Sequence, residues 1–274
     1  MEIFEYAFMQ KAFIVGLLIS VITPAIGLIV VLKRLSMIGD ALSHNALAGV
    51  AAGLAFGFNP IIGAVGISIL SAFGIEKIRK SFPKYSELSI AIIMATGIGL
   101  AGIFSGFVKN TAVFTSFLFG SIVAITDFEL YIILILSIVV ICALIMMYKE
   151  LFYITFDEES ARLAGVPVKL VDFIFTLLTA ITISISARTV GALVISSLMV
   201  IPVATSMQLA KSYKQTIVFS ILFGMFFTIF GLFISYYLGL KPGATIVMTG
   251  VIILVLTIAL RAVAGKKTIK SISK

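Results

Sequence analysis

The sequence has little charge and almost no histidine, cysteine or tryptophan. Of its 274 residues, 12% are charged, one is histidine, one is cysteine and none is tryptophan, whereas 61% are hydrophobic. Soluble domains are about half apolar and about a quarter charged. The scarcity of charge therefore excludes a water-soluble globule. The length accommodates about eight or nine spans of about 20 residues with short loops, so we expect an all-α, polytopic membrane protein with one transmembrane domain over residues 1–274.

The missing residue types also exclude several functions. Cys142 is the single cysteine and lies in an apolar run, so it has no partner for an intramolecular disulfide and is interpreted as a small core residue. The sequence contains no GxxxxGK[ST] phosphate loop and no nucleophile elbow, so ATP hydrolysis by that route must reside in another polypeptide. We expect a non-enzymatic subunit with no permanently bound cofactor.

The net charge of +8 does not indicate a nucleic-acid partner. Basic residues are scattered over short loops and form no patch interleaved with aromatic residues. The ordinary explanation is an excess of Lys and Arg on the cytoplasmic loops of a membrane protein. We therefore expect contact with lipid and none with nucleic acid.

Apolar runs bounded by charged or turn residues define the candidate spans. The segment 114–126 is too short to cross and is interpreted as re-entrant or interfacial. The run 190–209 contains Gly191 and Pro202, which favours a broken helix or a short hairpin and leaves the count at eight or nine. The candidate spans are 12–32, 36–57, 60–76, 87–107, 128–148, 168–187, 190–209, 215–238 and 243–262.

The distribution of Lys and Arg predicts the orientation. With nine spans and the N-terminus outside, most of the 20 basic residues lie on cytoplasmic segments, as the positive-inside rule requires. The C-terminus is then cytoplasmic. The four basic residues left outside are Lys11, Lys109, Arg188 and Lys241.

Asp40 and His44 are the strongest candidates for a metal site. They stand four residues apart at the start of an apolar run, so on a helix they share one face about one turn apart. An ionised carboxylate inside a bilayer is costly and usually serves an ion pathway, although a structural hydrogen bond between helices is the alternative. A carboxylate and an imidazole suit a borderline divalent cation, and a twofold dimer would raise two ligands to the four of tetrahedral zinc.

A second polar region lies at residues 155–167. Its acidic residues favour the start of a short helix, Gly165 is placed to end that helix, and Pro167 prevents its continuation. As the longest polar segment in the chain, it is either a docking surface for a cytoplasmic partner or a solvated connecting helix.

Several blocks of the sequence resemble the permeases of ABC importers that take up zinc, manganese or iron(II). The blocks are RLSMIGDALSHNALAGVAAGLAFGFNP (34–60), TSFLFGSIVAIT (115–126), TFDEESARLAGVPV (155–168) and TVGALVISSLMVIPVATSMQLAK (189–211). The resemblance implies an ABC importer permease fold in a bacterial-type cell membrane and a homodimer. It also implies an ATPase subunit on the cytoplasmic face of each permease and an extracytoplasmic metal-binding protein.

The resemblance also implies roles for particular residues. Asp40 and His44 match the acid and the histidine that meet the transported ion, while Asn45 stands where the family often has a small residue. Segment 157–165 matches the helix that couples the permease to its ATPase. Its candidate contact residues are Asp157, Glu158, Glu159, Ala161, Leu163 and Gly165.

The transported substrate is expected to be Zn²⁺ first and Mn²⁺ next. The segments VGALVISSLMVIPVATS and GFNP look more like the zinc branch, although a carboxylate and an imidazole suit both metals. One alternative is a permease for iron siderophores or cobalamin, whose large organic substrates have no need of an Asp–His pair. Another is an ion-coupled secondary transporter, for which Asp40 and Asp172 are the main intramembrane acids.

Overall fold

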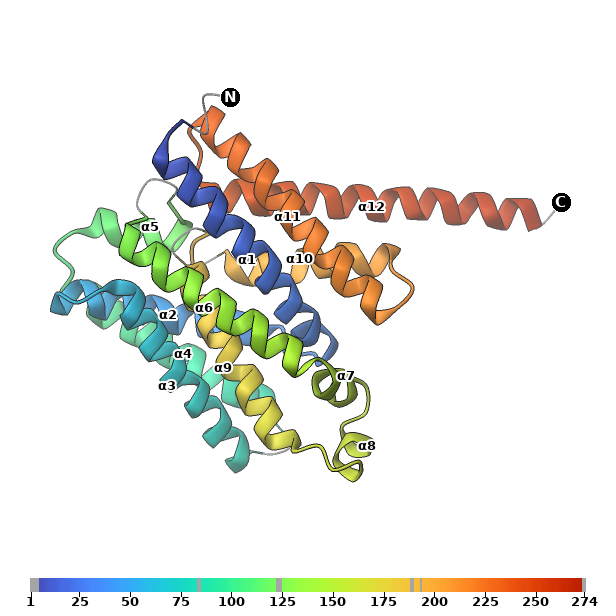
Figure 1. Ribbon diagram of the computed structural model, residues 1–274, viewed down its shortest axis with the longest axis horizontal. Helices are drawn as coiled ribbons and strands as arrows, with labels where there is room; N and C mark the ends of the chain where they lie inside the picture. The colour runs from blue at the N-terminus through green and yellow to red at the C-terminus, as the bar shows by residue number, and fades with distance from the viewer. Residues whose placement is uncertain (1–4, 83–84, 122–124, 188–189, 193, 273–274) are drawn as a thin grey trace.

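The computed structural model describes residues 5–82, 85–121, 125–187, 190–192 and 194–272, and all regular secondary structure in these residues is helical (Figure 1). Arg188 and parts of the blocks 115–126 and 189–211 lie outside the described residues. The helices are α1 (Ala7–Leu32), α2 (Met37–Phe56), α3 (Pro60–Ser81), α4 (Ser86–Ser105), α5 (Thr111–Phe119), α6 (Asp127–Met146), α7 (Tyr148–Phe156), α8 (Glu158–Leu163), α9 (Val168–Ser186), α10 (Ile195–Leu209), α11 (Tyr213–Leu238) and α12 (Pro242–Ile272).

The predicted all-α membrane architecture is confirmed. In the described part of the chain, seven helices are long and apolar enough to cross a bilayer, namely α1, α3, α4, α6, α9, α11 and α12. Helix α2 has 20 residues but carries Asp40, His44 and Asn45, which lower its hydropathy. Helix α10 has 15 residues and at about 1.5 Å per residue is shorter than the hydrocarbon core. These nine helices correspond to the nine predicted runs.

Local sequence signals fix several helix starts. Thr126 and Glu129 form a capping box at α6, with the Thr126 Oγ accepting from the Glu129 N–H and the Glu129 carboxylate accepting from the Thr126 N–H. The Asn59 side chain accepts from the Ile61 N–H at the start of α3, where Pro60 is the first helical residue. These caps satisfy backbone donors that neither lipid nor a neighbouring helix would satisfy.

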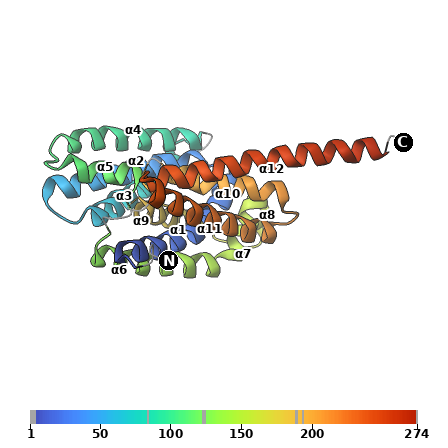
Figure 2. The ribbon, with the colours of Figure 1, turned by 90° about the horizontal axis from the view of Figure 1, so that it is seen from above.

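Figure 1 shows α1 lying between α6 and α11, which run in nearly the same direction, whereas α12 runs across them. Seen from above, α4 forms an outer layer over α2 and α3, and α12 extends past the remaining helices (Figure 2). Only 11% of the apolar window of α12 is buried, so lipid or another protein must cover it. The helices α1, α3 and α6 end, and α2, α9 and α11 begin, at the end of the bundle that carries α7 and α8.

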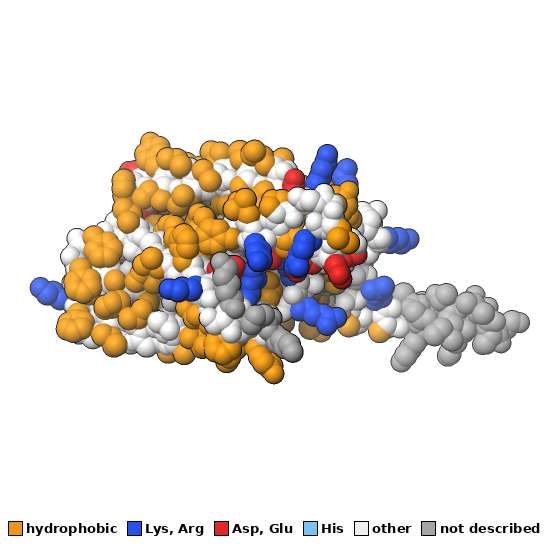
Figure 3. Space-filling view, turned by 90° about the horizontal axis from the view of Figure 1, so that it is seen from below, with side chains coloured by type: hydrophobic (Ala, Val, Ile, Leu, Met, Phe, Trp, Pro, Cys, Tyr) orange, Lys and Arg blue, Asp and Glu red, His pale blue; other side chains and the backbone are white. Residues whose placement is uncertain are grey.

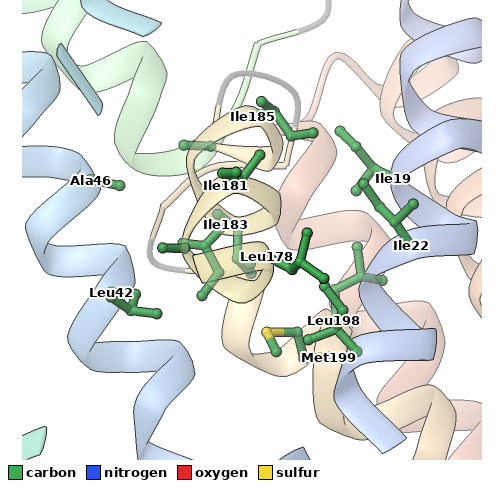
Figure 4. Packing of buried hydrophobic residues seen from close by; sticks show 14 of the residues in the cluster. Ile19, Ile22, Leu42, Ala46, Leu178, Ile181, Ile183, Ile185, Leu198 and Met199 are labelled. Atoms are coloured by element: carbon green, nitrogen blue, oxygen red, sulfur yellow. The ribbon is translucent and has the colours of Figure 1, made fainter. Parts of the chain in front are cut away.

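The core surrounds α9, which packs mainly on α3 and also on α1, α2 and α6. Figure 4 shows part of this core, with buried side chains of α1, α2 and α10 around α9. Ile19 and Ile22 of α1, Leu42 of α2, and Ile183 and Met199 of α9 and α10 are all nearly inaccessible. Because lipid tails are as apolar as these side chains, close packing rather than the hydrophobic effect holds such helices together.

Small residues bring α2 and α3 into close contact. A Cβ on Gly49 would lie 2.2 Å from the Gly63 carbonyl oxygen, so any residue other than glycine would clash there. One turn before Gly49, the buried Asn45 Nδ2 donates to the carbonyl oxygens of Ala41 and of Ile93 in α4, each at 2.8 Å. Helix α2 is therefore fixed against both α3 and α4.

The irregular segments predicted at 114–126 and 190–209 meet each other. Helix α5 is short, and its Phe117 carbonyl accepts a 2.8 Å hydrogen bond from the Ala192 N–H of the α9–α10 connection. Val190 and Ala192 are buried, and Gly191 has a φ of +96°. Irregular backbone inside a membrane protein is tolerated where protein satisfies it, and these contacts supply that satisfaction.

Charged side chains concentrate toward one end of the molecule. Figure 3 shows Lys, Arg, Asp and Glu gathered mostly over one half of the face, with hydrophobic side chains over most of the other half. At the opposite end, Lys11 forms a 2.7 Å ion pair with Asp127, and the Lys241 ammonium lies 4.1 Å from the centre of the Phe119 ring. Lys11 and Lys241 are two of the four basic residues that were predicted to lie outside, and the side of the membrane that this end faces stays a prediction.

Candidate metal pathway and coupling segment

Asp40 and His44 form an open strip on α2, which is otherwise buried between its two ends. The helix begins at Met37, five residues after α1 ends at Leu32, and Asp40 lies in its first turn. In the range 38–53 every residue is buried except Asp40 and His44, which are partly accessible. Their i, i+4 spacing puts them on one face with Cβ atoms about 5–6 Å apart. The opening therefore consists of one carboxylate and one imidazole.

Neither side chain is tied to a polar partner within the described chain. Among the described residues, Asp40 and His44 make no hydrogen bond and no ion pair. The described chain also contains no group of three or more His, Cys, Asp or Glu side chains able to hold a metal. One chain thus supplies two ligands, fewer than the four of a closed zinc site.

The neighbours of this pair belong to two other helices. Asn45 is turned toward α4, as its bond to the Ile93 carbonyl shows, so it is not a further ligand on the Asp40–His44 strip. On the other side, a Cβ on Gly39 would lie 3.3 Å from the Ser196 Oγ in the first turn of α10. The amino end of α10 therefore lies beside the first turn of α2.

A buried ion-pair cluster at the same end joins three helices. The Lys33 Nζ, just after α1, donates to the Asp172 Oδ1 of α9. The Arg79 guanidinium of α3 lies 3.8 Å from the other Asp172 oxygen and 2.8 Å from Glu76. Asp172 is 8% exposed. An acid held between two cations serves as a structural anchor between helices. Asp172 is therefore not available to bind the coupling ion of a secondary transporter.

The sequence alone does not predict this cluster, because Lys33 and Arg79 fall in segments expected to be cytoplasmic and Asp172 falls in a predicted span. The layout did contain a signal. The nine-span topology places the end of α1, the end of α3 and the start of α9 at one membrane face. The two cations Lys33 and Arg79 and the carboxylate of Asp172 therefore lie at the same level and can pair.

Helix α8 is built as a short, well-capped projection. The Asp157 carboxylate accepts from the Ser160 N–H at 3.0 Å and from the Ser160 hydroxyl at 2.5 Å. The Arg162 guanidinium bonds to Glu158 one turn earlier at 2.8 Å. Gly165 ends the helix with a φ of +85°, the left-handed conformation that glycine adopts without strain. The predicted short helix with a glycine stop is therefore present.

The candidate coupling residues divide into an anchor and an exposed surface. Ala161 is 3% exposed and holds α8 to the bundle, whereas Leu163 is 85% exposed at the tip. Asp157, Glu158, Glu159 and Gly165 are also exposed. An apolar side chain projecting among carboxylates at the end of a membrane protein offers a surface for a partner.

The capping bonds also set the charge of Asp157. Hydrogen bonds from the Ser160 hydroxyl and then from its N–H hold the pKa of the Asp157 carboxyl below its ordinary value. Since the folded pKa is lowered, the cap is fully formed above the ordinary aspartate range and is lost as pH falls through the lowered value. At neutral pH the start of α8 is anionic.

Comparison with known proteins identifies the family. The model of the ABC 3 transport family matches residues 5–261. A "Probable metal transport system membrane protein" of Treponema pallidum is 37% identical and covers 96% of this chain and 99% of its own length. Identity is 32% to the manganese transport system membrane protein MntC of Listeria monocytogenes, over 91% and 89% of the two chains. It is also 32% to the high-affinity zinc uptake system membrane protein ZnuB of Haemophilus influenzae, over 93% and 97%.

Among solved structures, PsaBC from Streptococcus pneumoniae in complex with Fab aligns with a TM-score of 0.82 at 28% identity, over 92% of this chain and 91% of that one. The similarity therefore extends through sequence and fold over nearly the full length. The chain belongs to the ABC 3 transport family.

Proposed function

We propose that this chain is the membrane-spanning permease subunit of an importer that moves a divalent metal ion into the cytoplasm. The observation that carries the proposal is the partly open Asp40–His44 strip on an otherwise buried α2. Ionisable groups are retained at such depth when they serve an ion path. Manganese and zinc systems among the relatives support the same class of substrate.

A dimer would complete the ion site. Two copies related by a twofold axis bring together two Asp40 carboxylates and two His44 imidazoles, which gives four ligands of the kinds that zinc and manganese accept. The strip is accessible in the single chain, so a second copy can reach it. The site is transient by design, because an ion that binds too tightly is not released inward.

Zinc before manganese stays a prediction. The relatives named for manganese and for zinc are equally similar to this chain, at 32% identity each, and a carboxylate–imidazole set suits both metals. Competition between Zn²⁺ and Mn²⁺ during uptake measures the preference directly.

The ATPase is proposed to dock on α8. The chain has no phosphate loop of its own, and α8 presents Leu163 and three exposed carboxylates at the charged end. Gly165→Arg is expected to abolish most metal-stimulated ATP hydrolysis and uptake in the reconstituted complex. The added side chain occupies the docking surface, and the left-handed backbone at Gly165 no longer suits the residue.

Gly239→Arg is the matched control for this change. Gly239 also has a positive φ, +64°, and open space around it, but it ends α11 at the opposite end of the bundle. The backbone strain and the charge added are alike, so this variant should still bind its ATPase and couple normally. Full coupling in Gly165→Arg, or equal loss in both variants, would contradict the docking role of α8.

The import direction requires α8 and the C-terminus to be cytoplasmic, with the opposite end facing an extracytoplasmic metal-binding protein. Cys142 is exposed, so its interpretation as a core residue is wrong, and it must be removed before labelling. On a Cys142→Ser background, a membrane-impermeant thiol reagent added outside intact cells is expected to label Lys109→Cys and to spare Lys149→Cys. Both positions are exposed in the structure, so access to the reagent depends on the side of the membrane. Labelling of position 149 with protection of position 109 would reverse the orientation.

A further inference from the structure

An apolar groove runs along α1 between α6 and α11. Both helices pack on α1, but they do not pack closely on each other, and Figure 1 shows α1 lying between them. The groove has a volume of about 240 Å³. Its floor is Ile22, Ala25 and Ile29 of α1, and its walls include Ile141 and Ile145 of α6 and Ile221 of α11.

The groove lies within helices that qualify as membrane spans. Its lining is almost entirely hydrocarbon, and it is open along one side. Its volume is slightly below the range of about 300–1,000 Å³ typical of drug-sized ligand pockets, so it suits one slender chain rather than a folded segment of protein. The surrounding medium in a bilayer is acyl chains, which match this lining.

Aromatic residues close the groove at the end that carries α7. The rings of Tyr148 and Tyr213 have centroids 5.9 Å apart, and Phe152 lies 5.0 Å from Tyr213 by the same measure. Both tyrosines line the groove. Tyrosine rings of this kind collect at the membrane–water interface, where one end is apolar and the other is wet.

Basic residues flank this closed end. Lys149 follows Tyr148 on one wall, and Lys211 and Lys214 bracket Tyr213 on the other, all three exposed. One acid, Glu150, stands beside Lys149 on α7 but does not line the groove. The end of the groove therefore carries a net positive charge at the level where lipid headgroups lie.

We infer that this groove binds one anionic phospholipid, with an acyl chain along α1 and its phosphate between Lys149 and Lys214. Lys or Arg residues at the cytoplasmic surface attract anionic headgroups, and a charged headgroup tethered to hydrocarbon matches both parts of the site. The site is separate from the Asp40–His44 strip. It joins α1 and α11 to α7, the helix that leads into α8, so an occupied groove would hold the base of the coupling segment against the bundle.

Native mass spectrometry of the purified permease with added phosphatidylglycerol or phosphatidylcholine tests the inference. We expect one phosphatidylglycerol retained per chain in preference to phosphatidylcholine, and thermal stabilisation by phosphatidylglycerol alone. Lys149→Gln with Lys214→Gln is expected to weaken phosphatidylglycerol binding about 25-fold, since each lysine near an anionic surface contributes about fivefold. The matched control changes Lys77 and Lys169, two basic residues at the same end that flank no groove-lining tyrosine, and should retain the lipid.

Filling the groove tests the acyl-chain position. Ala25→Phe blocks the floor, and Ile145→Trp, at a residue that is 69% exposed and so tolerant of size, covers the opening. Either variant should lose the retained lipid while staying folded. The inference is overturned if the two lipids are retained equally by the unchanged protein, or if the lysine or groove-filling variants keep phosphatidylglycerol. Equal stabilisation by water-soluble glycerophosphate, or a changed oligomeric state in place of lipid loss, would likewise overturn it.

Discussion

Asp40→Asn and His44→Leu are each expected to reduce metal uptake per folded permease by at least about tenfold. Even partners behind the ligands change metal affinity by about 10–100-fold when they are lost, and here a ligand itself is removed. Asn keeps the size of Asp40 without its charge, and Leu keeps the apolar bulk of His44 without its nitrogen. The measurement is ATP-driven uptake of Zn²⁺ and Mn²⁺ in vesicles that contain the permease and its ATPase.

Thermal stability, measured beside uptake, separates an ion site from a structural bond. Asp40 and His44 have no hydrogen-bond partner among the described residues, so both variants should melt at the temperature of the unchanged protein and still dimerise. Ser43→Ala is the matched control, because the Ser43 hydroxyl is buried on another face of α2 without a hydrogen-bond partner, and uptake should be normal. Normal uptake per folded permease in both site variants would remove the pair from the ion path.

Asp172→Asn is expected to destabilise the permease by about 3 kcal/mol, the lower end of the range for breaking a buried ion pair. The change leaves Lys33 buried without an anionic partner, whereas Arg79 keeps Glu76 at 2.8 Å. Adding Lys33→Met should recover most of the loss, since removing both charges leaves no unpaired ion. Thermal unfolding of the two single variants and the double variant in detergent measures the coupling.

The exposed ion pair on α8 is the control that shows how much burial contributes to the effect of losing an ion pair. Glu158 and Arg162 form a similar ion pair, but their side chains are 50% and 65% exposed, and surface pairs contribute about 0–1 kcal/mol. Glu158→Gln should therefore leave the melting temperature nearly unchanged. If Asp172→Asn were equally silent, or if Lys33→Met gave no recovery, the cluster would not anchor α1, α3 and α9.

Much of the fold was predictable because a bilayer permits few structures. Hydrophobic runs long enough to cross become helices, and each of the nine predicted runs overlaps one of α1 to α4, α6 and α9 to α12. The ends differ by up to five residues, except that α12 continues to Ile272, ten residues past the predicted end at 262. The observed helix ends differ from the predicted ones where an apolar run extends beyond the residues that adopt helical backbone. The run 190–209 forms a helix only from Ile195, because Gly191 adopts a positive φ and packs on α5. The sequence also does not show which glycines pack against another helix. Gly49 contacts Gly63 of α3, whereas Gly102 faces open space.

The candidate site was predictable as a pair of residues but not as a place. The i, i+4 spacing of Asp40 and His44 follows from the sequence, whereas their status as the open positions of α2 depends on α3, α4, α9 and α10 around it. The Lys33–Asp172–Arg79 cluster and the groove on α1 combine helices far apart in sequence, so no local pattern contains them. In the sequence, Ala161 looks as exposed as the other candidate coupling residues, yet it is buried on the side of α8 that faces the bundle.

The most direct test is the zinc coordination of the purified permease without its ATPase, because His44 is then the only histidine in the sample. In a protein without a histidine tag, on a Cys142→Ser background, X-ray absorption at saturating Zn²⁺ should show imidazole nitrogen at about 2.0–2.1 Å. His44→Cys should replace it with two sulfur ligands per zinc at about 2.3 Å, one from each copy. A zinc environment with no sulfur in that variant, or with one sulfur only, would contradict a cation site shared by Asp40 and His44 of two subunits.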